Sequence, residues 1–341
     1  MAIRPSLRTC TALLINRSSS SSSVALTRRS APCPYATESA LAPAGGQRRR
    51  YAVPRAPRVG TSYSEVFTLS DISQEALGSI ISRSGNVDTS LSAEKCYEYA
   101  GRFSQAIKDG SSPWAVSLGG GNAESARMLH QVACIMRQIH GSRSADAFAT
   151  AMWASASELG HRPATLSLAR QLIRSGAFGR MPQLRKVEAR FKQMVSTGKD
   201  PDALTAEGEL LFEQGSFDAA VTTLRRALRL ATGSFEWKAY CRLCLGKSLL
   251  KLGKREEALK VFEALSESGF AEAHMEIGMM LRSEDRDKAT RHLYAAACGG
   301  RQHLFSHLSE MALEEADGRS PEDSQRWAVE WSRLADPRVD Y

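Results

Sequence analysis

The sequence predicts an all-α fold: an α-solenoid of about six helix-turn-helix repeats, preceded by a small helical segment. The first observation is that apolar residues recur at helical spacing through residues 123–336. The second is a helical-hairpin pattern whose marker, a small residue, returns after 36, 39, 38, 32 and 31 residues. The third is that 43% of the 341 residues are hydrophobic, which is enough for a substantial core.

The first helix of each predicted repeat carries a small residue, usually directly after a large apolar one. The copies are Val132-Ala133, Leu168-Ala169, Gly208, Leu245-Gly246, Ile277-Gly278 and, more weakly, Leu308-Ser309. A small side chain lets a second helix approach closely. We therefore expect these positions to be the contact points between paired helices.

The second helix has its own signature, with residues that fill a seam at positions +4 and +7 and Gly or Ala at position +11. It reads Ala149, Trp153, Ala156, Gly160; Val187, Phe191, Met194, Gly198; Ala220, Leu224, Ala227, Ala231; Ala258, Phe262, Leu265, Gly269; Ala289, Leu293, Ala296, Gly300; and Ser324, Ala328, Trp331, Ala335. A glycine at the helix end tolerates the left-handed cap. Six copies in one register favour repeated helix pairs.

These residues resemble tetratricopeptide and Sel1-like repeats. The clearest copies are residues 206–231 (AEGELLFEQGSFDAAVTTLRRALRLA) and 245–265 (LGKSLLKLGKREEALKVFEAL), while 271–300 is closer to the Sel1-like form. The resemblance covers about residues 123–335. It implies a solenoid whose first helices line a concave face that holds peptides or proteins, and it brings no shared catalytic residues.

The N-terminal segment 1–51 differs sharply in charge from the rest. It holds eight arginines against the single acid Glu38, a net charge of +7, and a serine run at 18–23, whereas the other 290 residues carry +1. This composition is typical of a mitochondrial presequence, and a cut after Tyr51 would leave Ala52 as the mature terminus. We expect a location in the mitochondrial matrix; the alternative is a basic tail on a cytosolic protein. No run of 18 apolar residues is present to span a bilayer.

Between the presequence and the repeats the pattern changes twice. Residues 52–70 contain Pro and Gly without periodicity and are interpreted as a linker. Residues 71–122 are expected to form two N-terminal helices and a Gly-rich loop: Ser70-Asp71 would cap a helix running to about Arg83, and Leu91 to Lys108 would form the next. Residues 337–341 are assigned to a C-terminal tail.

No constellation in the sequence favours catalysis, a metal site or a cofactor. Cys241 and Cys244 are spaced like metal ligands on a helix, but no second cysteine pair follows. His303 and His307 lie four residues apart without the glutamate of a zincin motif. The glycines at 119–121 are not followed by Gly-Lys-Ser/Thr, so they do not predict a nucleotide loop. We expect a protein that is not an enzyme, without a cofactor.

The resemblance implies that positions one, four and five after the small residue face the concave groove. The basic residues there are the candidate partner-binding set: Arg137, Arg170, Arg174, Lys247, Lys251 and Arg282. Glu209, Glu213, Glu310 and Glu314 occupy the same rows, so the groove is mixed with a basic bias. A second basic cluster, residues 162–192, has a local net charge of +7. Such a groove suits an acidic or carboxylate-bearing segment of another protein.

The functional hypothesis is therefore a non-enzymatic mitochondrial adaptor or assembly factor for a respiratory complex or a translation component. The alternative is an RNA-binding helical-repeat protein of organellar gene expression. The near-neutral charge after residue 51 and the placement of aromatics at seam positions favour the protein-binding hypothesis.

Overall fold

The computed structural model describes residues 63–84, 91–119, 122–230, 233–314, 320–336 and 338. Those residues are helical or lie in turns and loops, which confirms the predicted all-α class. The helices are α1 Tyr63–Val66, α2 Gln74–Ser84, α3 Ala93–Lys108, α4 Asn122–Met136, α5 Arg143–Glu158, α6 Arg162–Ser175, the 3-10 helix η2 Pro182–Leu184, α7 Arg185–Thr197, α8 Pro201–Glu213, α9 Phe217–Leu230, α10 Lys238–Lys251, α11 Arg255–Ser266, α12 Ala271–Leu281, α13 Arg286–Cys298, α14 Leu304–Leu313 and α15 Pro321–Ala335. The predicted presequence with its cut at Ala52, and most of the predicted tail, lie outside the described residues.

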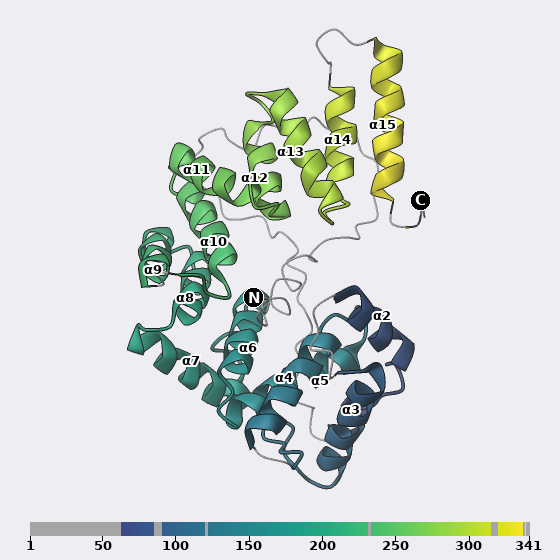
Figure 1. Ribbon diagram of the computed structural model, residues 1–341, viewed down its shortest axis with the longest axis vertical. Coiled ribbons are helices and arrows are strands. Elements are labelled where there is room, and N and C mark those ends of the chain that lie inside the picture. The colour runs from purple at the N-terminus through teal and green to yellow at the C-terminus, as the bar shows by residue number, and fades with distance from the viewer. Residues whose placement is uncertain are drawn as a thin grey trace, which may run out of the picture.

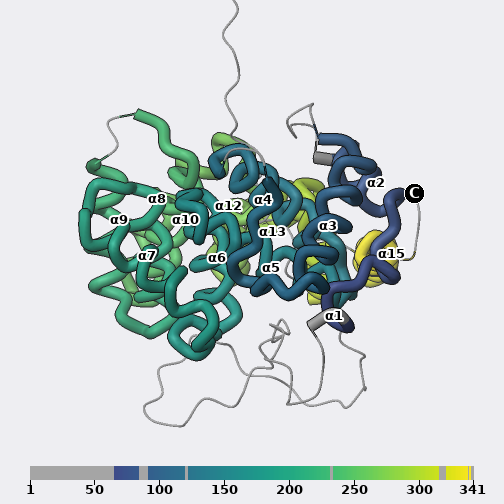
Figure 2. Tube along the Cα trace, turned by 90° about the horizontal axis from the view of Figure 1, so that it is seen from below, coloured from purple at the N-terminus to yellow at the C-terminus, as the bar shows by residue number. Residues whose placement is uncertain are grey.

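Helices α4 to α15 follow one another around an open arc, as expected for an α-solenoid (Figure 1). They form six successive pairs, from α4 with α5 to α14 with α15. In the middle of the arc α6, α8 and α10 lie on the inner side, and α7, α9 and α11 lie on the outer side (Figure 1). The view from below shows α2 and α3 at the same end as α15, across the opening of the arc (Figure 2).

The paired helices meet at the small residues that mark each repeat. A Cβ added at Gly246 would lie 2.4 Å from the Cε1 atom of Phe262, and one added at Gly208 would lie 2.5 Å from the Cδ2 atom of Leu224. Both partners are the +4 residues of the following helix and are fully buried. In the last pair Ser309 Oγ donates to the carbonyl of Ala328 at 2.7 Å. The predicted helix contacts therefore form the core of the solenoid.

Residues 63–67 form a helix and a buried anchor where the sequence pattern predicts a linker. Residues 63–66 form α1, and the adjacent Phe67 is 2% exposed, with its ring centroid 5.5 Å from that of Phe148 in α5. The interpretation as a linker is therefore wrong for residues 63–70. One buried aromatic residue anchors this stretch, and a single residue carries no periodicity.

The start of α2 also differs from the prediction. The helix begins at Gln74, and the hydroxyl of Ser73 accepts a hydrogen bond from the backbone N–H of Ala76 at 3.1 Å. Asp71 instead accepts a hydrogen bond from the hydroxyl of Ser142, which caps α5, at 2.7 Å. The predicted cap residue thus ties the N-terminal helices to the first repeat.

Candidate functional site

The basic residues of the inner helices bind carboxylates of the following repeat. Arg174 Nε in α6 lies 2.8 Å from Glu209 Oε1 in α8, and Lys247 Nζ in α10 lies 3.1 Å from Glu276 Oε1 in α12. Arg282, at the end of α12, lies 3.4 Å from Glu310 in α14. These contacts form an ion-pair ladder along the inner side of the solenoid. The ladder links one repeat to the next.

Arg170 lies at the buried end of this ladder. Its side chain is only 5% exposed, its Nε lies 3.2 Å from Glu209 Oε2, and its guanidinium packs 3.8 Å from the centroid of the Tyr240 ring. The Tyr240 hydroxyl donates to Glu209 as well. Arg170 was predicted to face an open groove. That placement is wrong, because the side chain fills the contact between α6, α8 and α10.

Glu209 is ionised at the centre of this cluster. Burial alone would raise the pKa of its carboxyl group, but the charges of Arg170 and Arg174 and the hydrogen bonds from Tyr240 and Arg174 hold that pKa below its ordinary value. Burial raises the pKa of the Tyr240 phenol well above its ordinary value, so the phenol stays protonated and can donate. The cluster is therefore a stable ionic contact between repeats.

The other predicted residues have different surroundings. Arg137 pairs with Asp146 within its own repeat. Arg282 is also bound to Glu314, so most of its donors are occupied. Lys251 is exposed and forms no ion pair with the residues that the structure describes. Of the six predicted donors, Lys251 is thus the one most available to a partner, and its role in binding stays a prediction.

Exposed apolar residues occupy the same inner rows, and sequence reasoning missed them. Met279, one position after the small residue of α12, is 38% exposed, and Leu313, four positions after that of α14, is 61% exposed. Leu250 lies in the same row of α10 and is half-buried. The row positions themselves could have revealed these residues, because the same three offsets select them. The inner face therefore combines apolar side chains with charges.

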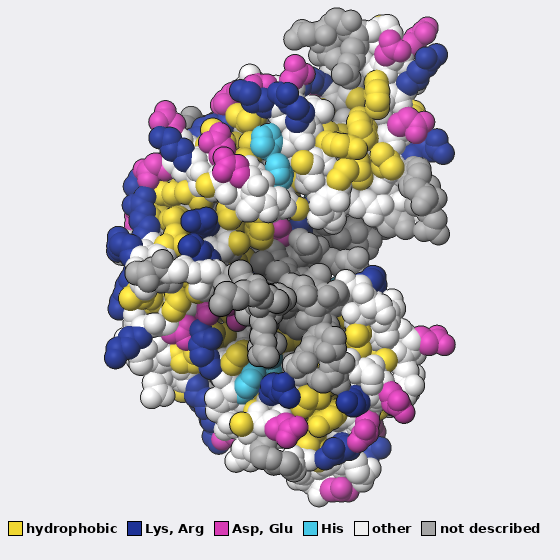
Figure 3. Space-filling model, in the orientation of Figure 1, with side chains coloured by type: hydrophobic (Ala, Val, Ile, Leu, Met, Phe, Trp, Pro, Cys, Tyr) yellow, Lys and Arg dark blue, Asp and Glu magenta, His cyan; other side chains and the backbone are white. Residues whose placement is uncertain are grey.

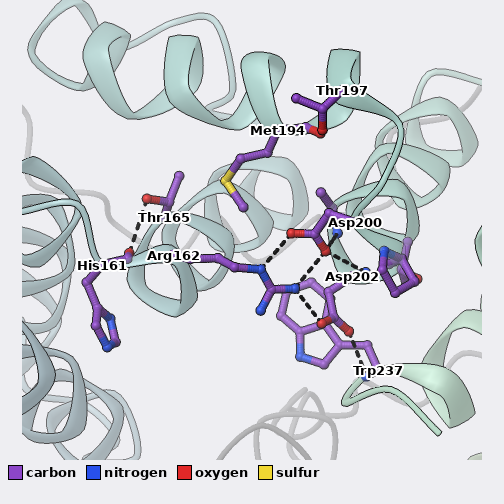
Figure 4. Close-up of polar contacts among 11 residues, drawn as sticks. His161, Arg162, Thr165, Met194, Thr197, Asp200, Asp202 and Trp237 are labelled. Carbon is purple, nitrogen blue, oxygen red and sulfur yellow. Dashed lines mark hydrogen bonds and ion pairs between the residues drawn. The ribbon is translucent and has the colours of Figure 1, made fainter. Parts of the chain in front are cut away.

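A separate cleft lies at one edge of the solenoid, between the ends of α5 and α7 and the starts of α6 and α8 (Figure 4). Its volume is about 380 Å³. The guanidinium of Arg162 reaches across to Asp200 through Nε at 2.6 Å and Nη2 at 2.6 Å, and to Asp202 at 2.7 Å. Asp202 also accepts the backbone N–H of Trp237 at 2.9 Å. These bonds connect three successive repeats.

Charge in this cleft is largely neutralised by its own residues. Asp200 caps α8 by accepting hydrogen bonds from the N–H groups of Asp202 and Ala203. Burial alone would raise the pKa of Asp200, but the hydrogen bond from Arg162 and these two backbone bonds hold that pKa below its ordinary value. The hydrogen bond to Asp200 is the main cause that raises the pKa of Arg162. The arrangement is a structural clamp between repeats rather than a set of free catalytic groups.

The cysteine pair singled out in the sequence is buried in the core. Burial raises the pKa of the Cys241 thiol to about 11 and that of the Cys244 thiol to about 12. Cys241 Sγ donates to the carbonyl of Leu224 at 3.5 Å. Protonated, packed thiols of this kind are poor metal ligands. Across the described ranges, no group of three or more His, Cys, Asp or Glu side chains is placed to hold a metal ion.

Among the described residues, none of the helices combines the length and the apolar character that crossing a bilayer requires.

Two family models match parts of the chain. The model described as anaphase-promoting complex, cyclosome, subunit 3 matches residues 187–265, and the model described as tetratricopeptide repeat matches residues 244–302. Together these segments run from α7 to the end of α13. No curated protein matches the chain. With the helix pairs and their seams, the matches define a tetratricopeptide-like helical-repeat protein, a class that typically acts as a scaffold for protein interactions.

Proposed function

We propose that the protein is a non-enzymatic scaffold of the mitochondrial matrix that holds an acidic, amphipathic segment of another protein on its inner face. The tetratricopeptide-like repeats support a protein-interaction role, since such solenoids present extended concave surfaces. The arginine-rich composition of residues 1–51 supports the location. A partner in a respiratory complex or in translation fits this location.

The observation that carries the proposal is the composition of the inner face in the last three repeats. Lys251 offers an ammonium group in α10 that forms no ion pair with the described residues, and Met279 and Leu313 expose apolar surface on α12 and α14. A partner segment can place a carboxylate on Lys251 and apolar side chains on the other two residues. Exposed apolar side chains in a concave surface are where peptide anchors bind.

The experiment is recovery of partners from isolated organelles with the tagged full chain. Lys251→Glu combined with Met279→Ser should lower partner recovery at least about ten-fold, because a buried anchor and a charge contact each contribute more than ~1 kcal/mol. The matched control is Lys260→Glu combined with Val329→Ser, which changes the same residue classes at exposed positions of α11 and α15, outside the inner face.

The control should recover partners as the unchanged protein does. Equal recovery by both double variants would show that the inner face is not the site. Recovery that nuclease treatment abolishes would favour the RNA-binding alternative.

A further inference from the structure

The outer side of the solenoid carries a basic surface that the proposed partner site does not use. It lies on the outward faces of α7 and α9, and we name it the outer basic face. Its members are Arg185, Lys192, Arg225, Arg226 and Arg229, all of them exposed. The only acids of these two helices are Glu188, which is buried, and Asp218, in the first turn of α9. The face is therefore strongly positive.

The two helices contribute to one continuous surface. Arg226 Nη2 in α9 donates to the carbonyl of Gly198, the C-cap of α7, at 3.4 Å. Both helices lie on the outer margin of the arc in Figure 1, and Lys and Arg side chains follow the same margin in Figure 3. The face ends at α11, where Arg225 bonds Glu257 at 2.7 Å and further glutamates are exposed.

These cations are mostly unpaired, in contrast to those of the inner ladder. Within the described part of the chain, Arg185, Lys192 and Arg229 form no ion pair with a carboxylate. Like charges gathered on two helices repel one another, so an anionic partner that neutralises them is bound favourably. The fold thus pairs most of its inner cations internally, whereas Arg185, Lys192 and Arg229 on the outer side have no carboxylate partner among the described residues.

The shape and composition of the face indicate which anion it fits. The aromatic residues of its two helices are Phe191, which is fully buried, and Phe217, which packs against Phe212. Beside the face, Phe178 lies under Lys192 and packs edge-on against Phe191, so a single half-buried ring is the stacking surface there. The face is convex, and a cylindrical nucleic-acid duplex would meet a convex surface over a small area. A bilayer is flat and fluid, so anionic lipids can gather beneath the cations.

An exposed leucine adds to this match. Leu230, the last residue of α9, is 43% exposed at the end of the outer basic face. An apolar side chain beside a basic surface can enter the boundary between headgroups and acyl chains. We propose that the outer basic face docks the protein on the surface of an anionic lipid bilayer, independently of the partner on the inner face.

Vesicle co-sedimentation of the full chain tests this proposal. One set of vesicles is phosphatidylcholine alone, and the other contains about one third phosphatidylserine. Arg185→Glu, Lys192→Glu and Arg229→Glu together should lower partition onto anionic vesicles at least about 100-fold, because each cation near such a surface contributes about five-fold. Residues 1–51 are the same in every variant, so differences in partition between variants arise from the substituted positions.

The matched control changes the net charge equally at exposed sites elsewhere: Lys260→Glu, Arg291→Glu and Arg326→Glu on α11, α13 and α15. It should lower partition by less than about ten-fold, through net charge alone. Equal losses for the two triple variants, or equal binding to neutral vesicles, would overturn the proposal. So would a loss of duplex RNA binding in the outer-face variant with vesicle binding intact. If circular dichroism shows that the Glu variant is unfolded, the same three positions are changed to Gln.

Discussion

At the scale of single residues, close packing of the paired helices depends on glycines, which have no side chain at the contact points. Gly208 and Gly246 let the +4 residue of the next helix occupy the space that a Cβ atom would fill. Gly278 does the same for Leu293, because a Cβ added at Gly278 would lie 2.7 Å from the Cγ atom of Leu293. Because the facing side chains are fully buried, they have little room to move away. The sequence could predict these contacts, since a recurring small residue and a recurring bulky residue are both visible in it.

We expect Gly246→Ala to destabilise the protein by about 1 to 3 kcal/mol, because the new methyl group overpacks against Phe262. The matched control is Gly101→Ala in α3, where the added Cβ would lie 3.9 Å from Leu69. That change should be neutral or stabilising by up to about 1 kcal/mol through helix propensity. Denaturant unfolding measures both. Similar midpoints for the two variants would show that the seam is placed wrongly.

The buried carboxylate of Glu209 leads to a pH-dependent prediction. Its folded-state pKa is lowered from 4.5, so its stabilisation is present above pH 4.5 and is lost as the pH falls through the lower folded value. Glu209→Gln should cost about 3 kcal/mol at neutral pH, because two guanidinium groups lose their partner.

The difference between Glu209→Gln and the unchanged protein should shrink as the pH is lowered below 4.5. Unfolding free energies measured at neutral and acidic pH give this difference. Glu256→Gln, at an exposed position of α11, is the control and should have little effect at either pH. If the difference in unfolding free energy between Glu209→Gln and the unchanged protein stays constant with pH, Glu209 is not the ionised centre of this cluster.

At the scale of elements, periodic segments were predictable and isolated contacts were not. The second predicted N-terminal helix, Leu91 to Lys108, corresponds closely to α3, whose N-cap is Ser92. α1 is four residues long and is anchored through Phe67, which gives no repeating signal. The loop after α3 is also fixed by a single contact: the backbone N–H of Val116 donates a hydrogen bond to the hydroxyl of Ser155 at 3.0 Å. Single contacts between residues so far apart in the sequence leave no pattern in it, so they become visible only in the structure.

Phe67→Ala should therefore destabilise the protein by about 3 to 5 kcal/mol, although Phe67 lies in a segment that looks like a linker. The cause is the loss of ring contacts with Phe103 and Phe148. Thermal unfolding measures the effect, and Glu65→Ala, at an exposed position of α1, is the control. A midpoint for Phe67→Ala equal to that of the control would mean that this segment does not pack on the first repeat.

At the scale of the whole molecule, the stacking of the repeats determines which charged side chains have an ion-pair partner and which do not. The sequence places acids and bases in the same rows, but only the stacking of repeats brings Arg174 to Glu209 and Lys247 to Glu276. Stacking also buries Arg170, and it leaves Lys251 without an ion pair to the described residues. Met279 and Leu313 lie at the same row offsets in the sequence, but their exposed fractions follow only from the stacking of the last helices.

The N-terminal segment gives a prediction about processing. Protein isolated from mitochondria should begin at Ala52, because the composition of residues 1–51 and the Arg49-Arg50-Tyr51 sequence resemble a presequence with its cleavage site. Sequencing the N-terminus of the organellar protein measures this. An intact Met1, or recovery in the cytosol, would contradict the proposed location.

Site-directed photocrosslinking in intact mitochondria can capture a protein segment held on the inner face of the solenoid. A photoreactive residue is placed at Met279 on the inner side of α12 or, for comparison, at Lys260 on the outer side of α11. We expect a discrete protein adduct from position 279 that is lost when Lys251→Glu is added, and no such adduct from position 260. Adducts of equal yield from both positions, or adducts that nuclease digests, would contradict this expectation.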